Sequence, residues 1–175
     1  MKTLLQTMAI LTLTMGTAGA DTPPALQPAL APLAGFLGTR HCSGSFLKNG
    51  KAIGSTESFS ADLSGHWLVM RHADEPPLTF DALELWGCNA QKKVFIARIF
   101  DNFGGAREFG SSGWDGDRFV WTNLDTNTPK QDHFVFERQP DAGYSFTYAV
   151  TADGKIWTDV DSLVCVTPHS ASAPA

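Results

Sequence analysis

Residues 66–105 hold three apolar runs separated by turn residues, and this pattern limits the possible fold more than any other feature of the chain. The runs span about residues 66–73, 79–87 and 94–101, and they are rich in β-branched and aromatic side chains. Within each run the side chains alternate with a period of two, whereas a helix would repeat its apolar residues every three or four positions. Proline, asparagine and glycine residues between the runs interrupt regular structure. The stretch therefore predicts three consecutive strands joined by turns.

Each of these runs carries apolar residues on both faces, and single charged side chains interrupt the faces. The interruptions are Arg71, Glu84 and Arg98. A charged group among apolar neighbours is costly to bury unless it is paired or hydrated. Two interpretations follow: the three side chains face solvent and cover apolar surface with their aliphatic stems, or they project into a polar-lined cavity.

Short strands of the same kind continue on both sides of the central stretch. Asn49-Gly50 and Asp153-Gly154 are strong hairpin signals, because both residues of each pair tolerate a positive φ. Further strands are expected over about residues 38–47, 53–61, 107–111, 119–122, 133–138, 144–151 and 156–166. The chain shows no alternation of strands with long helices, which argues against a nucleotide-binding α/β fold. The pattern predicts an all-β protein, an antiparallel up-and-down meander of about ten strands that closes into a barrel, with a sandwich as the alternative.

The first twenty residues have the pattern of a secretory signal peptide. Lys2 supplies the positive start, residues 4–15 form the apolar segment, and Ala18-Gly19-Ala20 is a small-residue cleavage site. The apolar segment is too short for a membrane span, and no later stretch is long and apolar enough to be one. We therefore expect a periplasmic or secreted protein, cleaved near Ala20, with no transmembrane segment.

The rest of the chain divides by composition. Residues 21–37 form a Pro/Ala-rich lead-in, for which we expect an extended path with one helical turn near residues 32–36, able to plug one end of a barrel. Residues 38–167 form a single β-barrel domain, and residues 168–175 form a disordered tail of Ser, Ala and Pro.

The charge of the chain argues against two classes of partner. The formal net charge is −5, and removal of Lys2 with the signal peptide makes it −6. An acidic protein of this kind is not expected to bind nucleic acid or anionic membrane surfaces.

Three cysteines remain in the mature chain: Cys42, Cys88 and Cys165. Export places them in an oxidising compartment, where a disulfide is allowed. If the sheet closes on itself, the first and last strands become neighbours, so a Cys42–Cys165 disulfide would join the two edges of the barrel. Cys88 is then left as a free thiol without an expected role. No Cys/His spacing indicates a zinc site.

Several short segments resemble those of a family of bacterial proteins. They are residues 33–39 (LAGFLGT), residues 63–68 (LSGHWL), Leu85-Trp86-Gly87, residues 100–105 and the GWDG turn at residues 113–116. The chain resembles uncharacterised, often exported bacterial lipocalin-like (calycin-like) β-barrel proteins, which are distantly similar to nitrobindin and fatty-acid-binding-protein barrels. The resemblance covers about residues 33–166 and implies a lipocalin/calycin-like barrel. Such families usually have Trp after the Gly-Thr pair, where this chain has Arg40.

The resemblance does not extend to a cofactor. Nitrobindin-like proteins hold haem through a histidine near the end of the chain, and the only late histidine here is His169, beyond the last expected strand. We therefore expect no haem and no other cofactor. We also expect no metal site: His66 and His72 share a strand face, but six residues of strand separate them by roughly 20 Å, too far to share one ion even if His41 or Glu84 were a third ligand.

Together these features predict an exported lipocalin-like barrel that binds a small, partly apolar ligand. The expected site lies near Arg71, Glu84 and Arg98, where Arg71 or Arg98 would meet an anionic head group. Trp86 and Phe100 would provide apolar wall.

Two other hypotheses stay open at this point. One is a non-enzymatic envelope or protein-interaction module with a filled barrel, whose contacts are made by the loops at residues 74–77 and 101–105. The other is a small-molecule enzyme with Asp101 and His72 as acid and base, although no nucleophile motif such as G-x-S-x-G is present. Because neither residue forms a recognisable catalytic pattern, no catalytic residue is predicted.

Overall fold

The computed structural model describes residues 23–125, 130–140 and 143–168. The predicted signal peptide, its cleavage site and His169 therefore lie outside the described residues, as does the predicted tail after Pro168.

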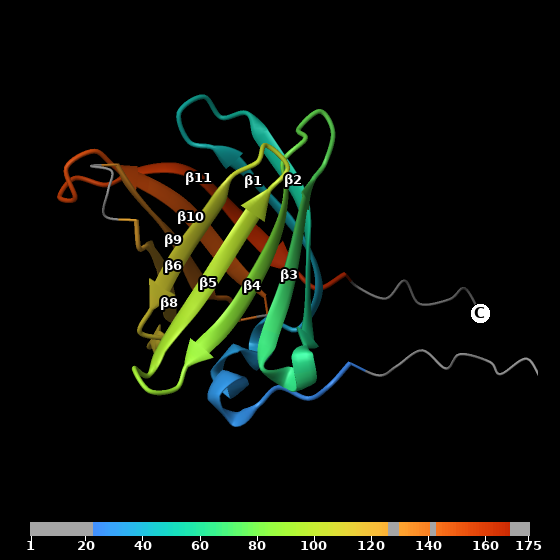
Figure 1. The fold of residues 1–175 in the computed structure, drawn as a ribbon. Helices are drawn as coiled ribbons and strands as arrows, with labels where there is room; N and C mark the ends of the chain where they lie inside the picture. The colour runs from blue at the N-terminus through green and yellow to red at the C-terminus, as the bar shows by residue number, and fades with distance from the viewer. Residues whose placement is uncertain (1–22, 126–129, 141–142, 169–175) are drawn as a thin grey trace, which may run out of the picture.

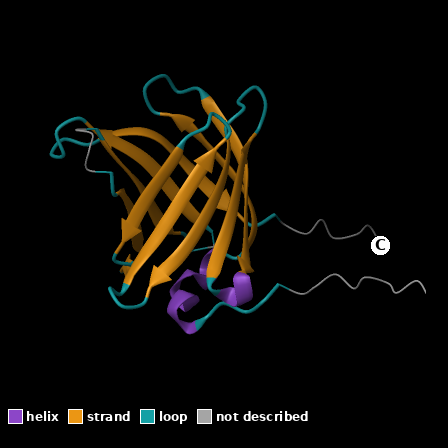
Figure 2. Ribbon diagram, viewed as in Figure 1, coloured by secondary structure: helices purple, strands orange, loops and turns teal. Residues whose placement is uncertain are grey.

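The described chain is almost entirely β-structure, preceded by one 3-10 helix (Figures 1 and 2). The helical elements are η1 (Pro28–Phe36) and η2 (Leu63–Gly65). The strands are β1 (Gly38–Phe46), β2 (Ala52–Asp62), β3 (Trp67–Asp74), β4 (Asp81–Asn89), β5 (Val94–Asp101), β6 (Ala106–Ser111), β7 (Trp114–Asp115), β8 (Arg118–Asn123), β9 (Gln131–Arg138), β10 (Tyr144–Thr151) and β11 (Thr158–Val166). None of the helices in the described part of the chain is long and apolar enough to cross a membrane.

The strands pair antiparallel in sequence order and close into a ten-stranded barrel, with the two-residue β7 as an additional strand beside β8. Two pairings produce the closure: β1 pairs with β11, and β6 pairs with β8. Figure 1 shows the strands tilted around a common interior, as closure of a sheet requires. The predicted antiparallel meander closing into a barrel is confirmed, and the sandwich alternative is not adopted.

The period-two alternation of the strands determines what lies inside the barrel. On β3 the buried residues are Leu68 and Met70, while Arg71 of the same strand is exposed. On β5 the buried residues are Phe95, Ala97 and Ile99. The inward faces of the strands therefore supply the apolar core, and the outward faces carry most of the charge.

The helix η1 covers one end of the barrel (Figure 2). Its residues Leu30, Leu33 and Phe36 are buried. The Phe36 ring contacts aromatic rings of several strands, among them Trp86 at 5.1 Å between centroids and Tyr144 at 5.1 Å. The helix is nine residues long, and thus longer than the single turn expected from the sequence.

Arg40 holds this helix in place from the first strand. Its guanidinium donates hydrogen bonds to the backbone oxygens of Gly35 (2.6 Å) and Phe36 (2.6 Å), with a longer contact to Leu37 (3.3 Å). The last carbonyls of a helix have no partner within the helix, so a buried cation at this point satisfies them. Arg40 thus fixes the end of η1 by hydrogen bonding.

A disulfide joins the two strands that close the barrel. Cys42 of β1 and Cys165 of β11 are directly opposite each other in the β1–β11 ladder, and their sulfur atoms are bonded. The predicted Cys42–Cys165 disulfide is confirmed, and Cys88 is a free, half-buried thiol.

Candidate functional site

A cavity of about 320 Å³ lies inside the barrel. Its wall includes Phe46 and Asp74, the last residues of β1 and β3, so the cavity lies toward the end of the barrel opposite η1. The apolar part of the wall consists of Phe46, Ile53, Met70, Phe80, Ile99, Trp121, Phe134, Phe136, Phe146 and Leu163. The barrel is thus filled by aromatic side chains at the η1 end and is hollow at the other end.

A chain of hydrogen-bonded ionisable groups enters this cavity from β2 and β3. His72 lies between two carboxylates, with Nε2 2.8 Å from Asp74 Oδ1 and Nδ1 3.4 Å from Glu57 Oε1. Burial lowers the pKa of His72, but the hydrogen bonds and charges of Glu57 and Asp74 outweigh it and raise the pKa to about 9. At neutral pH the imidazole is therefore a cation that donates to both carboxylates.

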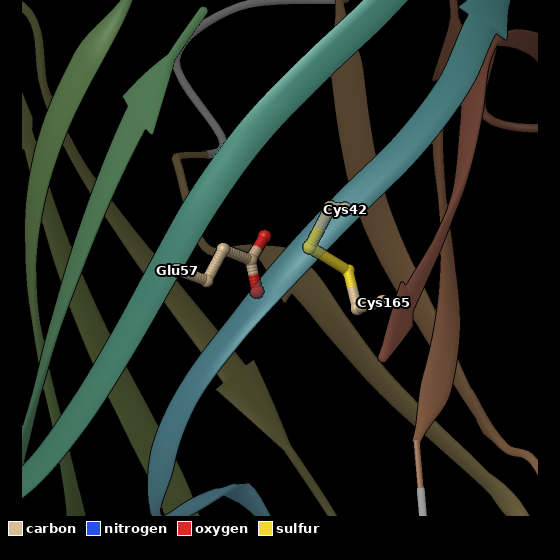
Figure 3. Close-up of side chains that lie close together, drawn as sticks. All are labelled: Cys42, Glu57 and Cys165. Atoms are coloured by element: carbon tan, nitrogen blue, oxygen red, sulfur yellow. A yellow bond between two sulfur atoms is a disulfide. The ribbon is translucent and has the colours of Figure 1, made fainter. Parts of the chain in front are cut away.

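Glu57 continues this chain toward the closing strands. It is almost fully buried and accepts a short hydrogen bond from the Tyr144 hydroxyl. Burial and the neighbouring Glu57 carboxylate raise the pKa of Tyr144 well above its ordinary range, so the phenol stays protonated and donates. Figure 3 shows Glu57 on β2 with its carboxylate beside the Cys42–Cys165 disulfide. In the described part of the chain, Cys42, Glu57 and Cys165 are the one group of three side chains close enough together to hold a metal ion. Because the two sulfur atoms are bonded to each other, the group offers no thiolate to a metal ion.

Glu84 projects from β4 into the same cavity. One of its carboxylate oxygens accepts a 2.6 Å hydrogen bond from Trp86 Nε1. Burial raises the pKa of Glu84, and although the Trp86 hydrogen bond opposes this, the pKa is about 7. No described cation forms an ion pair with Glu84.

Arg107 lines the cavity from β6, but its positive charge is paired with the Asp132 carboxylate. Its guanidinium lies 2.7 Å from Asp132 Oδ2, which also accepts a hydrogen bond from the Tyr148 hydroxyl at 3.3 Å. The other oxygen of Asp132, Oδ1, accepts from Asn123 Nδ2. Arg107 is thus engaged by a carboxylate that does not itself line the cavity.

Asp161 on β11 is the least satisfied of the cavity groups. Its Oδ1 is buried and has no hydrogen-bond partner among the described residues. Burial raises its pKa, a backbone N–H of Tyr148 opposes this, and the nearby Asp74 adds to the rise, giving a pKa of about 6. An unpartnered buried carboxylate oxygen is uncommon, because each such group loses its hydration without compensation.

The residues predicted from the sequence divide between the two sides of the wall. Glu84 lines the cavity, and Trp86 is fully buried beside it, in the aromatic packing around Phe36. Arg71 and Arg98 lie on the outer face, and Arg98 is 56% exposed and paired with Glu108 at 3.1 Å. Phe100 is 43% exposed on the same outer face.

Of Arg71, Glu84 and Arg98, Glu84 alone lines this cavity. Glu84 of β4 lies opposite Met70 of β3 and Ile99 of β5, which also line the cavity. Arg71 and Arg98 lie opposite Leu83 and Leu85, so they project from the other face of the sheet.

Asp101 also lies outside the cavity wall. Its Oδ1 accepts from the backbone N–H groups of Phe103 and Gly105, so it holds the β5–β6 turn. Of the two acid–base candidates considered in the sequence, His72 alone lines the cavity.

The sequence reasoning did not single out Glu57, Asp74, Arg107 or Asp161. For Asp161 a signal was present: it precedes Cys165 by four residues and Leu163 by two, so the alternation places all three on one face. An inward disulfide at Cys165 therefore also implies an inward Asp161.

Comparison with known proteins supports the fold. No protein-family profile matches the chain. No curated protein matches it either. Among solved structures, the crystal structure of Rv2717c from M. tuberculosis is similar, with a TM-score of 0.58 and 13% identity over 82% of this chain and 99% of that chain. At this identity the likeness shows a shared barrel fold and nothing further.

Proposed function

We propose that this protein is an exported binding protein, which holds a small, partly apolar molecule inside its barrel. The observation that carries the proposal is the cavity itself: about 320 Å³ lined mostly by aromatic and aliphatic side chains, with a small number of polar groups. Cavities that bind small molecules have this composition, in which the apolar wall supplies affinity and a few polar groups fix orientation.

The size of the cavity limits the ligand. At about 30 Å³ for each water, it has room for roughly ten water molecules, or for an organic molecule of similar volume. The walls are mostly apolar, and water in such a space forms few hydrogen bonds, so its release on binding favours an apolar ligand.

Export rests on the sequence of residues 1–20 and on the compartment that the disulfide needs. The Cys42–Cys165 bond is compatible with an oxidising compartment such as the periplasm. The signal-peptide pattern supplies the route to that compartment.

A fluorescent probe tests the proposal. N-phenyl-1-naphthylamine is neutral, partly apolar and small enough for the cavity, and its emission rises when it leaves water. We expect saturable binding with one site per chain, measured with excitation outside the tryptophan absorption band.

Two variants of one strand locate the binding. Ile99→Trp enlarges a side chain that lines the cavity, whereas Ile96→Trp makes the same change on the outer face of β5. We expect the first to weaken probe binding by about tenfold or more and the second to leave it unchanged. Equal affinities for the two folded variants, or no saturable binding by the wild-type protein, would contradict the proposal.

A surface-interaction function is the second candidate, and one observation favours it. Apolar side chains are exposed on loops around the open end of the barrel: Leu47 between β1 and β2, Phe103 between β5 and β6, and Ile156 between β10 and β11. If the wild-type barrel excludes every neutral probe, these loops become the place to look for a partner.

A further inference from the structure

We propose that the ligand is an amine, with an apolar, preferably aromatic body and an ammonium group. Asp161 and Glu84 bind this ammonium group inside the barrel. This inference rests on the proposed function and adds the chemical class of the ligand.

The first argument is the balance of charge on the cavity wall. Four carboxyl groups and two cationic side chains line the cavity: Glu57, Asp74, Glu84, Asp161, His72 and Arg107. The cations are already engaged, since His72 is held by Glu57 and Asp74, and Arg107 is held by Asp132 from outside the wall. The acids in excess are therefore Glu84 and Asp161, and the group that is missing is a cation.

The second argument is the hydrogen bonding of Asp161. Its Oδ1 is buried with no donor among the described residues, although it belongs to a residue of the cavity wall. A carboxylate oxygen only accepts when it is ionised, so the partner that would satisfy it must donate. An ammonium group offers both the donors and the charge.

The third argument concerns Glu84. Trp86 engages one of its oxygens, and no described donor is hydrogen-bonded to the other. The Trp86 N–H holds the carboxylate in position from the aromatic end of the barrel, and the second oxygen is left for a ligand.

The wall between these acids suits the proposed ligand. Trp121, Phe146 and Tyr148 line the cavity with Asp161. Aromatic faces attract cations, most strongly where water is excluded, and they also pack against an aromatic body. An anionic ligand would instead meet two unpaired acids and no free cation among the described wall residues.

Three probes that share one body test the inference: 4-phenylbutylamine, 4-phenyl-1-butanol and 4-phenylbutyrate. They differ in the terminal group alone, which is cationic, neutral or anionic. Affinities are measured by displacement of N-phenyl-1-naphthylamine and checked by titration calorimetry. At about pH 8 we expect the amine to bind about tenfold or more tightly than the alcohol and the carboxylate to bind most weakly, because a hydrogen bond to a charged group is worth more than a neutral one.

Substitutions assign the preference to the two acids. Asp161→Asn should reduce the advantage of the amine over the alcohol about tenfold while leaving the alcohol affinity unchanged. Asp159→Asn makes the same change in the same strand at an exposed position and should alter neither affinity. If Asp161→Asn does not fold, Glu84→Gln replaces it, because the amide oxygen can still accept from Trp86 and the negative charge is lost.

The pH dependence gives a second readout. Facing the cavity are Glu57, His72, Asp74, Glu84, Arg107, Tyr148 and Asp161 from six strands. Among these, burial leaves Asp161 and Glu84 with pKa values of about 6 and about 7, so both are partly protonated at mildly acidic pH. Binding of an ammonium group should drive their protons off, and its affinity should rise between about pH 5 and about pH 8.

The outcomes separate the inference from the proposed function. Equal binding of amine and alcohol, or tightest binding of the carboxylate, would overturn the inference and leave a binding protein for another ligand class. An amine preference that persists in Asp161→Asn and in Glu84→Gln would also overturn it. Absence of binding by all three probes overturns the inference, and only if N-phenyl-1-naphthylamine also fails to bind is the proposed function itself overturned.

Discussion

Removal of the disulfide tests how the barrel is held closed. Cys42 and Cys165 are separated by 123 residues, so the bond constrains nearly the whole barrel in the unfolded chain. The chain-entropy relation for a loop of this length gives a stabilisation of about 5 kcal/mol at 25 °C. We expect the double variant Cys42→Ala/Cys165→Ala to lose about 4–5 kcal/mol of unfolding free energy.

The assay is urea unfolding followed by tryptophan fluorescence. With a urea m-value of about 2 kcal/mol/M, the midpoint should fall by roughly 2 M. Cys88→Ala is the matched control, because Cys88 is the cysteine outside the disulfide. We expect the control to lie within about 1 kcal/mol of the wild type.

The folded double variant should retain its closing ladder. Six residue pairs join β1 to β11, from His41–Val166 to Phe46–Asp161, and the disulfide replaces none of their backbone hydrogen bonds. Probe binding should therefore be kept at urea concentrations well below the midpoint. A double variant as stable as the Cys88→Ala control would refute the reasoning that the bond acts mainly on the unfolded chain.

Two further predictions concern buried charges. Arg40→Met keeps the apolar stem but leaves the carbonyls of Gly35 and Phe36 without their donor. We expect the free energy of unfolding in urea to fall by about 2–4 kcal/mol. A fall below about 1 kcal/mol would contradict the role given to Arg40. The second prediction is that thermal stability falls from about pH 5 to about pH 9. Protonated His72, whose pKa is raised to about 9, contributes on the order of 3 kcal/mol of stability, which is fully present below pH 6.5 and is lost as the pH rises through 9. The raised pKa values of Glu84 and Asp161 act in the same direction, because the folded state becomes less stable as these buried acids ionise near pH 7 and pH 6. Thermal unfolding across this range checks it, His72→Gln should flatten the part of the slope between pH 7 and 9, and a melting temperature that rises with pH would contradict it.

The fold could be predicted from the sequence because its information is local. Strands such as Val94–Asp101 and Tyr144–Thr151 agree in their bounds with the alternating patterns, since turn residues flank both. The disulfide followed from one topological step, the closure of the sheet. The nine-residue η1 was underestimated because its prolines at positions 28 and 32 interrupt the usual helix pattern.

The cavity was harder to predict because both faces of the central strands are apolar. Alternation shows which residues share a face, and it does not say which face is inside when Leu83 and Leu85 compete with Ala82 and Trp86. The alternation alone therefore does not show that Arg71 and Arg98 lie on the outer face.

Long-range pairing explains the residues that the sequence reasoning missed. Asp161 and His72 are separated by about half the chain, and both line the cavity because β11 pairs with β1 rather than because of any local motif. Arg107 likewise obtains its partner Asp132 from a strand 25 residues later. Contacts of this kind depend on register and shear, which single-sequence patterns do not specify.

A crystal structure of the protein with 4-phenylbutylamine would test the central claim most directly. We predict one molecule inside the barrel, with its ring against Trp121 and its ammonium nitrogen within hydrogen-bond distance of the Asp161 carboxylate. An empty interior at saturating amine, or the molecule bound on the outer face near Phe100, would contradict the account.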